Sequence, residues 1–292
     1  MKVVGFTFIR NAIQFDYPIV EAVRSILPLC DEVVVAVGRS DDETLALVQS
    51  IDSEKIRIIE TVWDDTLRTN GAVLAVETNK AFDAVGADAD WCFYIQGDEC
   101  LHEKFLPTVK AAMEKWKDDP HTEGLLFKYT HFYGSYDYIA TSRKWYRHEI
   151  RIIKNDKSIR SYRDAQGFRK NGQKLKVREV AACIYHYGWV KPPQAQQLKQ
   201  VSMNKLWHSD EVVKQKIPDV ESFDYTHIDD LERFDGSHPA VMQRRIQALN
   251  WTFSFDPTKR KLSMKEQFSR FIERCTGWRI GEYKNYEKKA EA

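Results

Sequence analysis

The chain has 292 residues, of which 43% are hydrophobic and 30% are charged. This balance is typical of a globular protein, and the length suffices for one large domain or for one domain with a substantial appendage. The net charge is +1, which disfavours a general nucleic-acid-binding protein. After Ala240 the sequence contains twelve Lys/Arg and six Asp/Glu, so positive charge is concentrated in this segment.

The cysteines and the N-terminal segment bear on the cellular setting. The five cysteines form no CxxC pair, and their odd number argues against a disulfide framework and a structural zinc site. We therefore expect a reduced, cytoplasmic setting. No stretch reaches the roughly twenty apolar residues of a membrane helix. Residues 1–10 begin like a signal peptide, but the apolar run stops at Arg10, so we expect a buried first strand.

Strands and helices alternate over the first hundred residues. Short β-branched and aromatic runs predict strands at residues 3–9, 32–37, 56–60 and 91–95. Helical spacing predicts helices at residues 17–27, 44–48 and 71–85. This alternation predicts an α/β fold with a mostly parallel sheet flanked by helices.

Polar side chains follow several of these strands. Asn11 follows the first strand, Asp41 and Asp42 follow the second, and Asp98 follows the fourth. Because ligands of parallel α/β sheets bind at the carboxyl ends of the strands, we expect these groups to share one site.

The second half of the chain has a different pattern. We expect a helix at residues 104–116, aromatic strands at 124–129, 151–154 and 181–187, and helices after Pro192-Pro193. The predicted domain spans residues 1–235, with two halves of different pattern at about 1–100 and about 101–235. Residues 236–292 are expected to form a basic, aromatic, mainly helical C-terminal extension.

Asp98 and Glu99 close a buried strand directly after Gly97. Carboxylates in this position suit a hard divalent cation, which prefers oxygen ligands and can neutralise a diphosphate leaving group. The alternative is a solvated acidic turn that caps the following helix.

Two further residues are candidates for chemistry. His186 ends an apolar run and could complete a metal site, although a lone histidine is more often a hydrogen-bonded, half-buried side chain. Asp164 lies in a glycine-containing loop and could be the general base that deprotonates an acceptor hydroxyl. The alternative for Asp164, favoured by sequence alone, is a local salt bridge with Arg163 or Arg169.

Two segments mix aromatic and basic residues. Residues 143–148 could stack on a sugar and hold an anion, bind nucleic acid, or form a solvated loop; the near-neutral charge weighs against nucleic acid. The C-terminal extension could lie on an anionic membrane surface. We favour packing of its aromatic side chains on the main domain, because Trp251, Phe253 and Phe255 alternate as in a strand.

Taken in chain order, the motifs of residues 1–190 resemble those of the family 2 glycosyltransferases with the GT-A fold. The first strand of that family ends at an asparagine, as at Asn11, and the second leads into a Ser-x-Asp-x-Thr turn, as in Ser40–Thr44. A helical asparagine, here Asn79, precedes the metal-binding strand. That strand ends in an Asp-x-Asp or Ala-Asp-Glu motif, which Gly97-Asp98-Glu99 resembles.

The resemblance implies a UDP- or GDP-linked sugar donor, a divalent cation (Mn²⁺ or Mg²⁺), and direct displacement with inversion at the anomeric carbon. It places the nucleotide-sugar against Asn11, Ser40, Asp42, Asn79, Gln96 and Asp98. The implied metal ligands are Asp98, Glu99 and His186. Asp164 falls where the family has its catalytic base. The resemblance also makes residues 1–100 the nucleotide-binding half and residues 101–235 the acceptor half.

The chain also departs from the family pattern. Gly38-Arg39 stands where many members have an aspartate that recognises the nucleobase, and Ala12 replaces a glutamate. Thr78 stands in place of an arginine before the helical asparagine. The metal motif opens with Gln96-Gly97, which leaves only Asp98 and Glu99 to supply charge.

The leading hypothesis is therefore a cytoplasmic glycosyltransferase of the hexosyltransferase type. The expected acceptor is a saccharide or lipid-linked saccharide in cell-surface polysaccharide or glycolipid synthesis, with peripheral contact at the inner face of the membrane as an option. One alternative is a nucleotidyltransferase, but residues 8–12 contain no glycine for a triphosphate-binding loop. Another is a catalytically inactive sugar- or partner-binding module, suggested by the acidic residues missing at Gly38 and Gly97.

Overall fold

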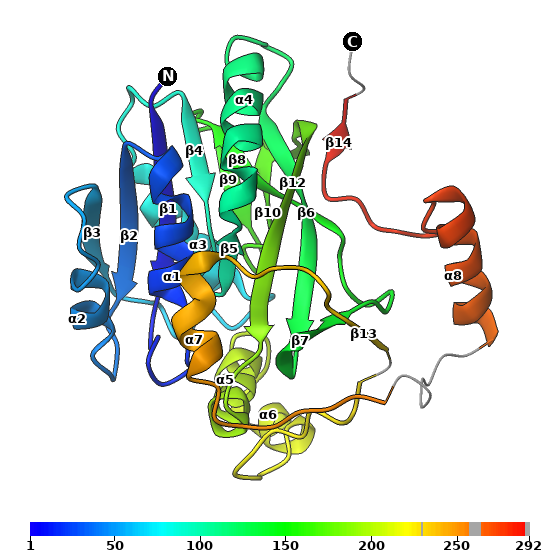
Figure 1. Cartoon of the computed structure of the whole chain (residues 1–292). Coiled ribbons are helices and arrows are strands. Elements are labelled where there is room, and N and C mark those ends of the chain that lie inside the picture. Colours follow the sequence, from blue (N-terminus) through cyan, green and yellow to red (C-terminus); the bar gives the residue numbers. More distant parts are fainter. Residues whose placement is uncertain (229, 257–263, 290–292) are drawn as a thin grey trace.

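The computed structural model describes residues 1–228, 230–256 and 264–289 (Figure 1). Its large sheet contains β1 (Val3–Ile9), β2 (Glu32–Gly38), β3 (Ile56–Thr61), β4 (Trp91–Tyr94), β5 (Glu99–Leu101), β6 (Gly124–Tyr133), β7 (Ser135–Ala140), β8 (His148–Lys154), β12 (Lys176–Trp189), β13 (Leu231–Arg233) and β14 (Glu287–Lys288). A small sheet contains β9 (Ile159–Tyr162), β10 (Gly167–Lys170) and β11 (Gln173–Lys174). The helices are α1 (Ile19–Ile26), α2 (Thr44–Gln49), α3 (Ala72–Asp83), α4 (Leu106–Trp116), α5 (Pro193–Lys205), α6 (Asp210–Lys216), α7 (Gln243–Gln247) and α8 (Met264–Thr276).

The first half of the large sheet is parallel. Its strands lie in the order β3-β2-β1-β4, and each neighbouring pair runs in the same direction. Alternate residues of these strands pack on opposite faces: Val33 and Val35 against α1, and Val34 and Ala36 against α3. The predicted α/β sheet flanked by helices is therefore confirmed, and the near-continuous apolar runs reflect burial of both faces.

The second half of the sheet mixes directions. β8 pairs antiparallel with β4 and β6, whereas β12 runs parallel to β6 and antiparallel to β5. The strands predicted at residues 124–129, 151–154 and 181–187 are present and each extends further than expected. Parallel pairing thus joins β1 to β4 in the first half and β12 to β6 in the second, and the long β12 carries the chain back to the same edge.

A buried ion pair joins the two halves. Glu99 on β5 and Arg151 on β8 are both fully buried, with Nη2–Oε1 and Nε–Oε2 distances of 2.7 and 2.8 Å. The Tyr129 hydroxyl on β6 donates to Glu99 Oε1 at 2.8 Å. The guanidinium lies 5.2 Å from the ring centroids of Tyr94 and Tyr129. Four strands therefore meet at one charge pair.

The segments after β12 continue across the strand ends and the side of the sheet. The helix predicted after Pro192 is α5, which lies just beyond the end of β12 (Figure 1). Trp251 packs on the second half of the sheet and its Nε1 donates to Gly134 O at 2.7 Å. Phe253 and Phe255 pack beside Tyr138, in agreement with the favoured packing interpretation.

The C-terminal extension is only partly described, because residues 257–263 and 290–292 lie outside the described ranges. Within these ranges it contains α7, α8 and the short strand β14, which pairs with β12. Phe268 and Phe271 on α8 are 65% and 64% exposed. None of the helices in the described ranges has the length and apolar character needed to cross a bilayer. The domain boundary at residue 235 and membrane contact stay predictions.

We predict that Arg151→Met lowers the free energy of unfolding by about 3–5 kcal/mol, because it leaves the Glu99 carboxylate buried without its partner. The double variant Glu99→Gln/Arg151→Met should lose less, because no uncompensated charge remains. Urea unfolding followed by circular dichroism measures both effects. A double variant that is as unstable as Arg151→Met would contradict this account.

Candidate functional site

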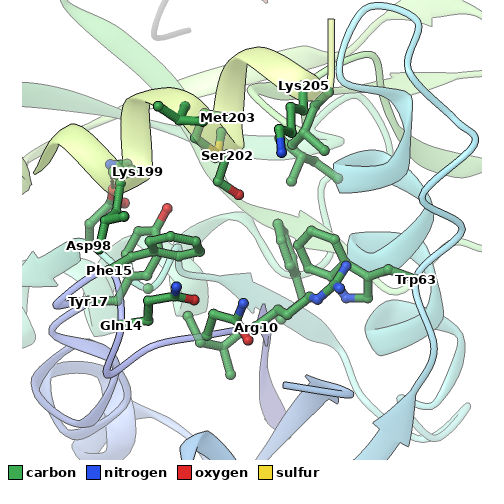
Figure 2. Close-up of a pocket in the computed structure, with 18 of the residues that line it drawn as sticks. Arg10, Gln14, Phe15, Tyr17, Trp63, Asp98, Lys199, Ser202, Met203 and Lys205 are labelled. Carbon is green, nitrogen blue, oxygen red and sulfur yellow. Dashed lines mark hydrogen bonds and ion pairs between the residues drawn. The ribbon is translucent and has the colours of Figure 1, made fainter. Parts of the chain in front are cut away.

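A cavity of about 680 Å³ lies where β1 and β4 end, beneath α5 (Figure 2). Its walls come from the turns after these strands, the loop between β9 and β10, the end of β12 and one side of α5. The predicted site residues that line it are Asn11, Gln96, Asp98, Asp164 and His186, together with the strand-end residue Asp41. The structure thus brings together residues that are far apart in the sequence.

Asp98 is 7% exposed and lies at one end of this cavity. Lys199 Nζ on α5 donates to Asp98 Oδ2 at 3.2 Å, and His186 Nε2 lies 3.7 Å from the same oxygen. Burial opposes ionisation, but the Lys199 ammonium and His186 hold the pKa of Asp98 well below its usual value. Asp98 is therefore ionised and its charge is already matched by a lysine.

Gly188 leaves the space that this cluster needs. A Cβ atom at Gly188 would lie 2.6 Å from both Asp98 Oδ2 and His186 Nε2. The Gly188 carbonyl also accepts a hydrogen bond from Lys199 Nζ at 3.0 Å. The glycine after Tyr187 is thus required by the close approach of three polar side chains.

His186 is held by a second histidine. His131 Nε2 donates to Tyr146 O at 2.8 Å, so its Nδ1 is free to accept the hydrogen of His186 Nδ1 at 3.1 Å. Burial lowers the pKa of His186 to about 4. The contact with His131 thus fixes the orientation of the His186 ring, with Nε2 3.7 Å from Asp98 Oδ2.

The prediction that Glu99 is a metal ligand does not agree with its surroundings. Both of its oxygens are bound by Arg151, and Oε2 also accepts from the Gln96 amide at 3.1 Å. The side chain is fully buried and does not line the cavity. Because Arg151 lies 52 residues away, the sequence alone could not show that Glu99 is occupied.

The remaining predicted ligands do not fit a divalent cation. Across the described ranges, no cluster of three His, Cys, Asp or Glu side chains is arranged to hold a metal ion. A divalent ion about 4 Å from Asp98 would gain about 8 kcal/mol at an effective dielectric constant near 20. An equal repulsion from Lys199 at the same distance would offset this gain. Within the described ranges the site therefore offers fewer than three such ligands together, and Lys199 opposes a divalent cation beside Asp98.

Several predicted nucleotide-binding residues instead stabilise the fold. Ser40 Oγ accepts from the Asn11 amide at 3.0 Å, and Asp42 accepts from the backbone amides of Gln14 and Thr44 at 2.8 and 3.0 Å. The Asn79 side chain exchanges two hydrogen bonds with the backbone of Ser161. Neither Ser40, Asp42 nor Asn79 lines the cavity.

Asn11 connects this turn network to the cavity. Its side-chain Nδ2 donates to Asp41 Oδ2 at 3.1 Å, and its Oδ1 accepts from the Asp41 amide at 2.9 Å. Asn11 has a φ of 53°, in the left-handed region that asparagine tolerates better than most residues. The residue therefore ends β1 and fixes Asp41 at the cavity wall.

Asp164 lies on a strained loop. Its neighbours Arg163 and Ala165 have φ values of 53° and 59°, an uncommon conformation for residues other than glycine. Gln96 Nε2 donates to Ala165 O at 3.3 Å and ties the loop to the end of β4. Neither Arg163 nor Arg169 forms an ion pair with Asp164, so the salt-bridge alternative is not observed within the described ranges.

An aromatic wall closes the other end of the cavity. Trp63 packs on Phe8 with ring centroids 5.7 Å apart, and the Arg10 guanidinium lies 5.5 Å from the Trp63 ring. A Cβ atom at Gly38 would lie 2.4 Å from Trp63 Nε1. A longer side chain at position 38 would therefore collide with the Trp63 ring.

Sequence reasoning missed Lys199, Trp63, Tyr17 and Trp207 among the cavity residues. Lys199 lies on a predicted helix, but one lysine among many carries no signal of its position. The basic segment 143–148 does not line this cavity. Its Arg147 is paired with Glu282 at 2.7 Å and with Glu273 at 3.2 Å.

No family model and no curated protein matches this chain. Among the solved structures that resemble it are residues 1–349 of S. aureus TarS in complex with UDP-GlcNAc (14% identity, TM-score 0.40). Another is glucosyl-3-phosphoglycerate synthase from Mycobacterium tuberculosis in complex with Mn²⁺, UDP and phosphoglyceric acid (15% identity, TM-score 0.30). A third is 4-diphosphocytidyl-2C-methyl-D-erythritol synthase from Anaerococcus prevotii (11%, 0.37).

These matches cover 70%, 44% and 65% of this chain, and 65%, 43% and 91% of the other chains, respectively. The chain thus spans less than two thirds of the length of the first two. The TM-scores are 0.40 or lower, so none of these likenesses assigns an activity to the chain.

We predict that Glu149→Gln stabilises the protein at pH 8. Glu149 is 3% exposed, its Oε2 has no hydrogen-bond partner within the described ranges, and burial raises its pKa to about 8. The pKa of Glu149 is 4.5 in the unfolded chain and about 8 in the folded protein, so the folded state holds the proton more tightly. The free energy of unfolding therefore falls as the pH rises from 4.5 to about 8. Glu149→Gln should raise the free energy of unfolding at pH 8 by an amount on the order of 3–5 kcal/mol.

Chemical unfolding at pH 4 and pH 8 measures this difference, which should disappear near pH 4. The matched control is Glu114→Gln, an exposed residue on α4. A stabilisation that does not change with pH would contradict the assignment of a protonated Glu149.

Proposed function

We propose that the chain is a glycosyltransferase that binds a nucleotide-diphosphate sugar in the cavity at the carboxyl edge of the sheet. The observation that carries this proposal is the gathering of Asn11, Asp98, Asp164 and His186, with the lysine Lys199, around one cavity. The sequence motifs that resemble family 2 glycosyltransferases contribute several of these residues independently.

The two ends of the cavity suit the two parts of such a donor. The aromatic wall of Trp63 and Phe8, with Asn11 and Asp41 nearby, offers stacking surface and hydrogen-bonding groups for a nucleoside. Lys199 offers positive charge for the diphosphate at the other end. The volume of about 680 Å³ is within the usual range of small-molecule sites.

Asp164 is the proposed catalytic base. Its carboxylate takes the proton of the acceptor hydroxyl, whose oxygen forms the new bond to the anomeric carbon. The bond from that carbon to the β-phosphate oxygen breaks, and its electron pair leaves with the nucleoside diphosphate. A single displacement of this kind inverts the anomeric centre. The strained loop and the absence of an ion pair to Arg163 or Arg169 support this role.

Metal dependence is not part of this proposal, because Glu99 is occupied and Lys199 lies against Asp98. Transfer to a saccharide or lipid-linked acceptor, in cell-surface polysaccharide or glycolipid synthesis, is retained as the proposed context. A nucleotidyltransferase remains the second candidate, although the turn after β1 has no glycine-rich phosphate loop.

We predict that the protein binds UDP- or GDP-sugars with a Kd of roughly 1 μM to 1 mM, the usual range of enzyme–substrate affinities. Isothermal titration calorimetry against a panel of both donor types measures this. Release of pyrophosphate from a nucleoside triphosphate would instead favour the nucleotidyltransferase. A folded sample that binds no nucleotide-sugar with or without metal would refute the proposal.

We predict that Asp164→Asn lowers kcat for sugar transfer by about 10²–10⁴-fold and changes the donor Kd by less than about threefold, because it removes a general base but little binding surface. The assay measures release of nucleoside diphosphate with a panel of saccharide acceptors. Asp52→Asn, an exposed aspartate outside the cavity, is the matched control. Unchanged turnover in Asp164→Asn would exclude it as the base.

A further inference from the structure

Lys199 lies where a diphosphate-binding cation is needed. The side chain comes from the middle of α5, is 9% exposed, and lines the cavity beside Asp98 and above Tyr17 (Figure 2). Its Nζ donates to Asp98 Oδ2 at 3.2 Å and to Gly188 O at 3.0 Å. The position of the ammonium is thus set by oxygens from two different segments.

The surroundings keep Lys199 charged. Its Nζ is ion-paired with Asp98 Oδ2 at 3.2 Å and lies 5.0 Å from the Tyr17 ring centroid. A second buried lysine, Lys191, lies 4.3 Å from the Tyr17 ring centroid, but its Nζ donates to Asp16 O and does not line the cavity. Lys199 is therefore the lysine of this pair that a ligand in the cavity can reach.

A fixed ammonium can stabilise the negative charge of a leaving diphosphate, as a metal ion does. Positive groups aimed at developing charge in a buried site stabilise the transition state, and lysine, arginine and Mg²⁺ all serve in this way. Of the two carboxylates in Gly97-Asp98-Glu99, Asp98 is the one that lines the cavity, because Glu99 is paired with Arg151. Asp98 then acts as a positioning residue for Lys199.

We propose that Lys199 takes the place of a divalent cation in this site, binding the donor diphosphate and stabilising the leaving nucleoside diphosphate, so that the reaction needs no divalent metal. This proposal rests on the proposed glycosyltransferase function. When the bond between the anomeric carbon and the phosphate oxygen breaks, the electron pair stays on that oxygen. A Lys199 N–H donates to the diphosphate, while the acceptor proton passes to Asp164.

Donor binding and turnover with and without metal test this proposal. Calorimetry measures the affinity for the UDP- or GDP-sugar that binds best, once in EDTA and once in about 5 mM Mn²⁺ or Mg²⁺, a concentration on the order of saturation. We expect Kd and kcat to agree within about threefold under these conditions. Lys199→Met should raise Kd by about 10–100-fold, the usual effect of losing a charge-assisted hydrogen bond. Lys199→Arg, which keeps the charge, should recover part of the affinity.

Lys110→Met is the matched control, because Lys110 is exposed on α4 and does not line the cavity. Circular dichroism checks that each variant is folded, and the EDTA comparison on the unaltered protein does not depend on any variant. Binding or turnover that appears only with Mn²⁺ or Mg²⁺ would overturn the proposal, as would an unchanged Kd in folded Lys199→Met. Failure of every donor to bind with or without metal would instead refute the glycosyltransferase function itself.

Discussion

Arg151 is buried completely in the middle of the sheet, and a guanidinium in that position requires a carboxylate against it. Glu99 supplies this partner from β5, and Tyr129 completes the hydrogen bonds of the carboxylate. The pair lies where the parallel half of the sheet meets the mixed half. Removing either partner would leave an unpaired charge buried between the two halves. The end of β4 and the start of β5 are thereby held in one arrangement.

The position of Asp98 follows from this constraint. Because Glu99 turns into the core, its neighbour Asp98 lies at the cavity beside His186 and Lys199. Two glycines permit the close packing around it. Gly188 leaves room for the polar cluster, and Gly97 lets the turn approach Ile9, whose Cδ1 would lie 2.9 Å from an added Cβ. An acidic pair in the sequence thus separates into one residue buried in the sheet and one residue at the cavity.

The departures from the family pattern have physical counterparts in the structure. Gly38 stands where many members of the resembling family have an aspartate, and Trp63 packs against it at the aromatic end of the cavity. Gln96 opens the motif that starts with an aspartate in that family, and its side-chain amide ties the Asp164 loop to the end of β4. These replacements substitute packing and neutral hydrogen bonds for negative charge. This pattern fits the proposal that Lys199 is the cation at a donor diphosphate.

The sequence by itself determined the alternation of strands and helices, because burial of both sheet faces leaves continuous apolar runs and burial of one helix face leaves a 3.6-residue period. It also placed Asn11, Asp41 and Asp98 near one site, since residues that follow parallel strands share an edge. Only the tertiary structure decided which partner each charge has. Glu99 meets Arg151 across 52 residues and Asp98 meets Lys199 across 101, and no local pattern encodes such distant pairs.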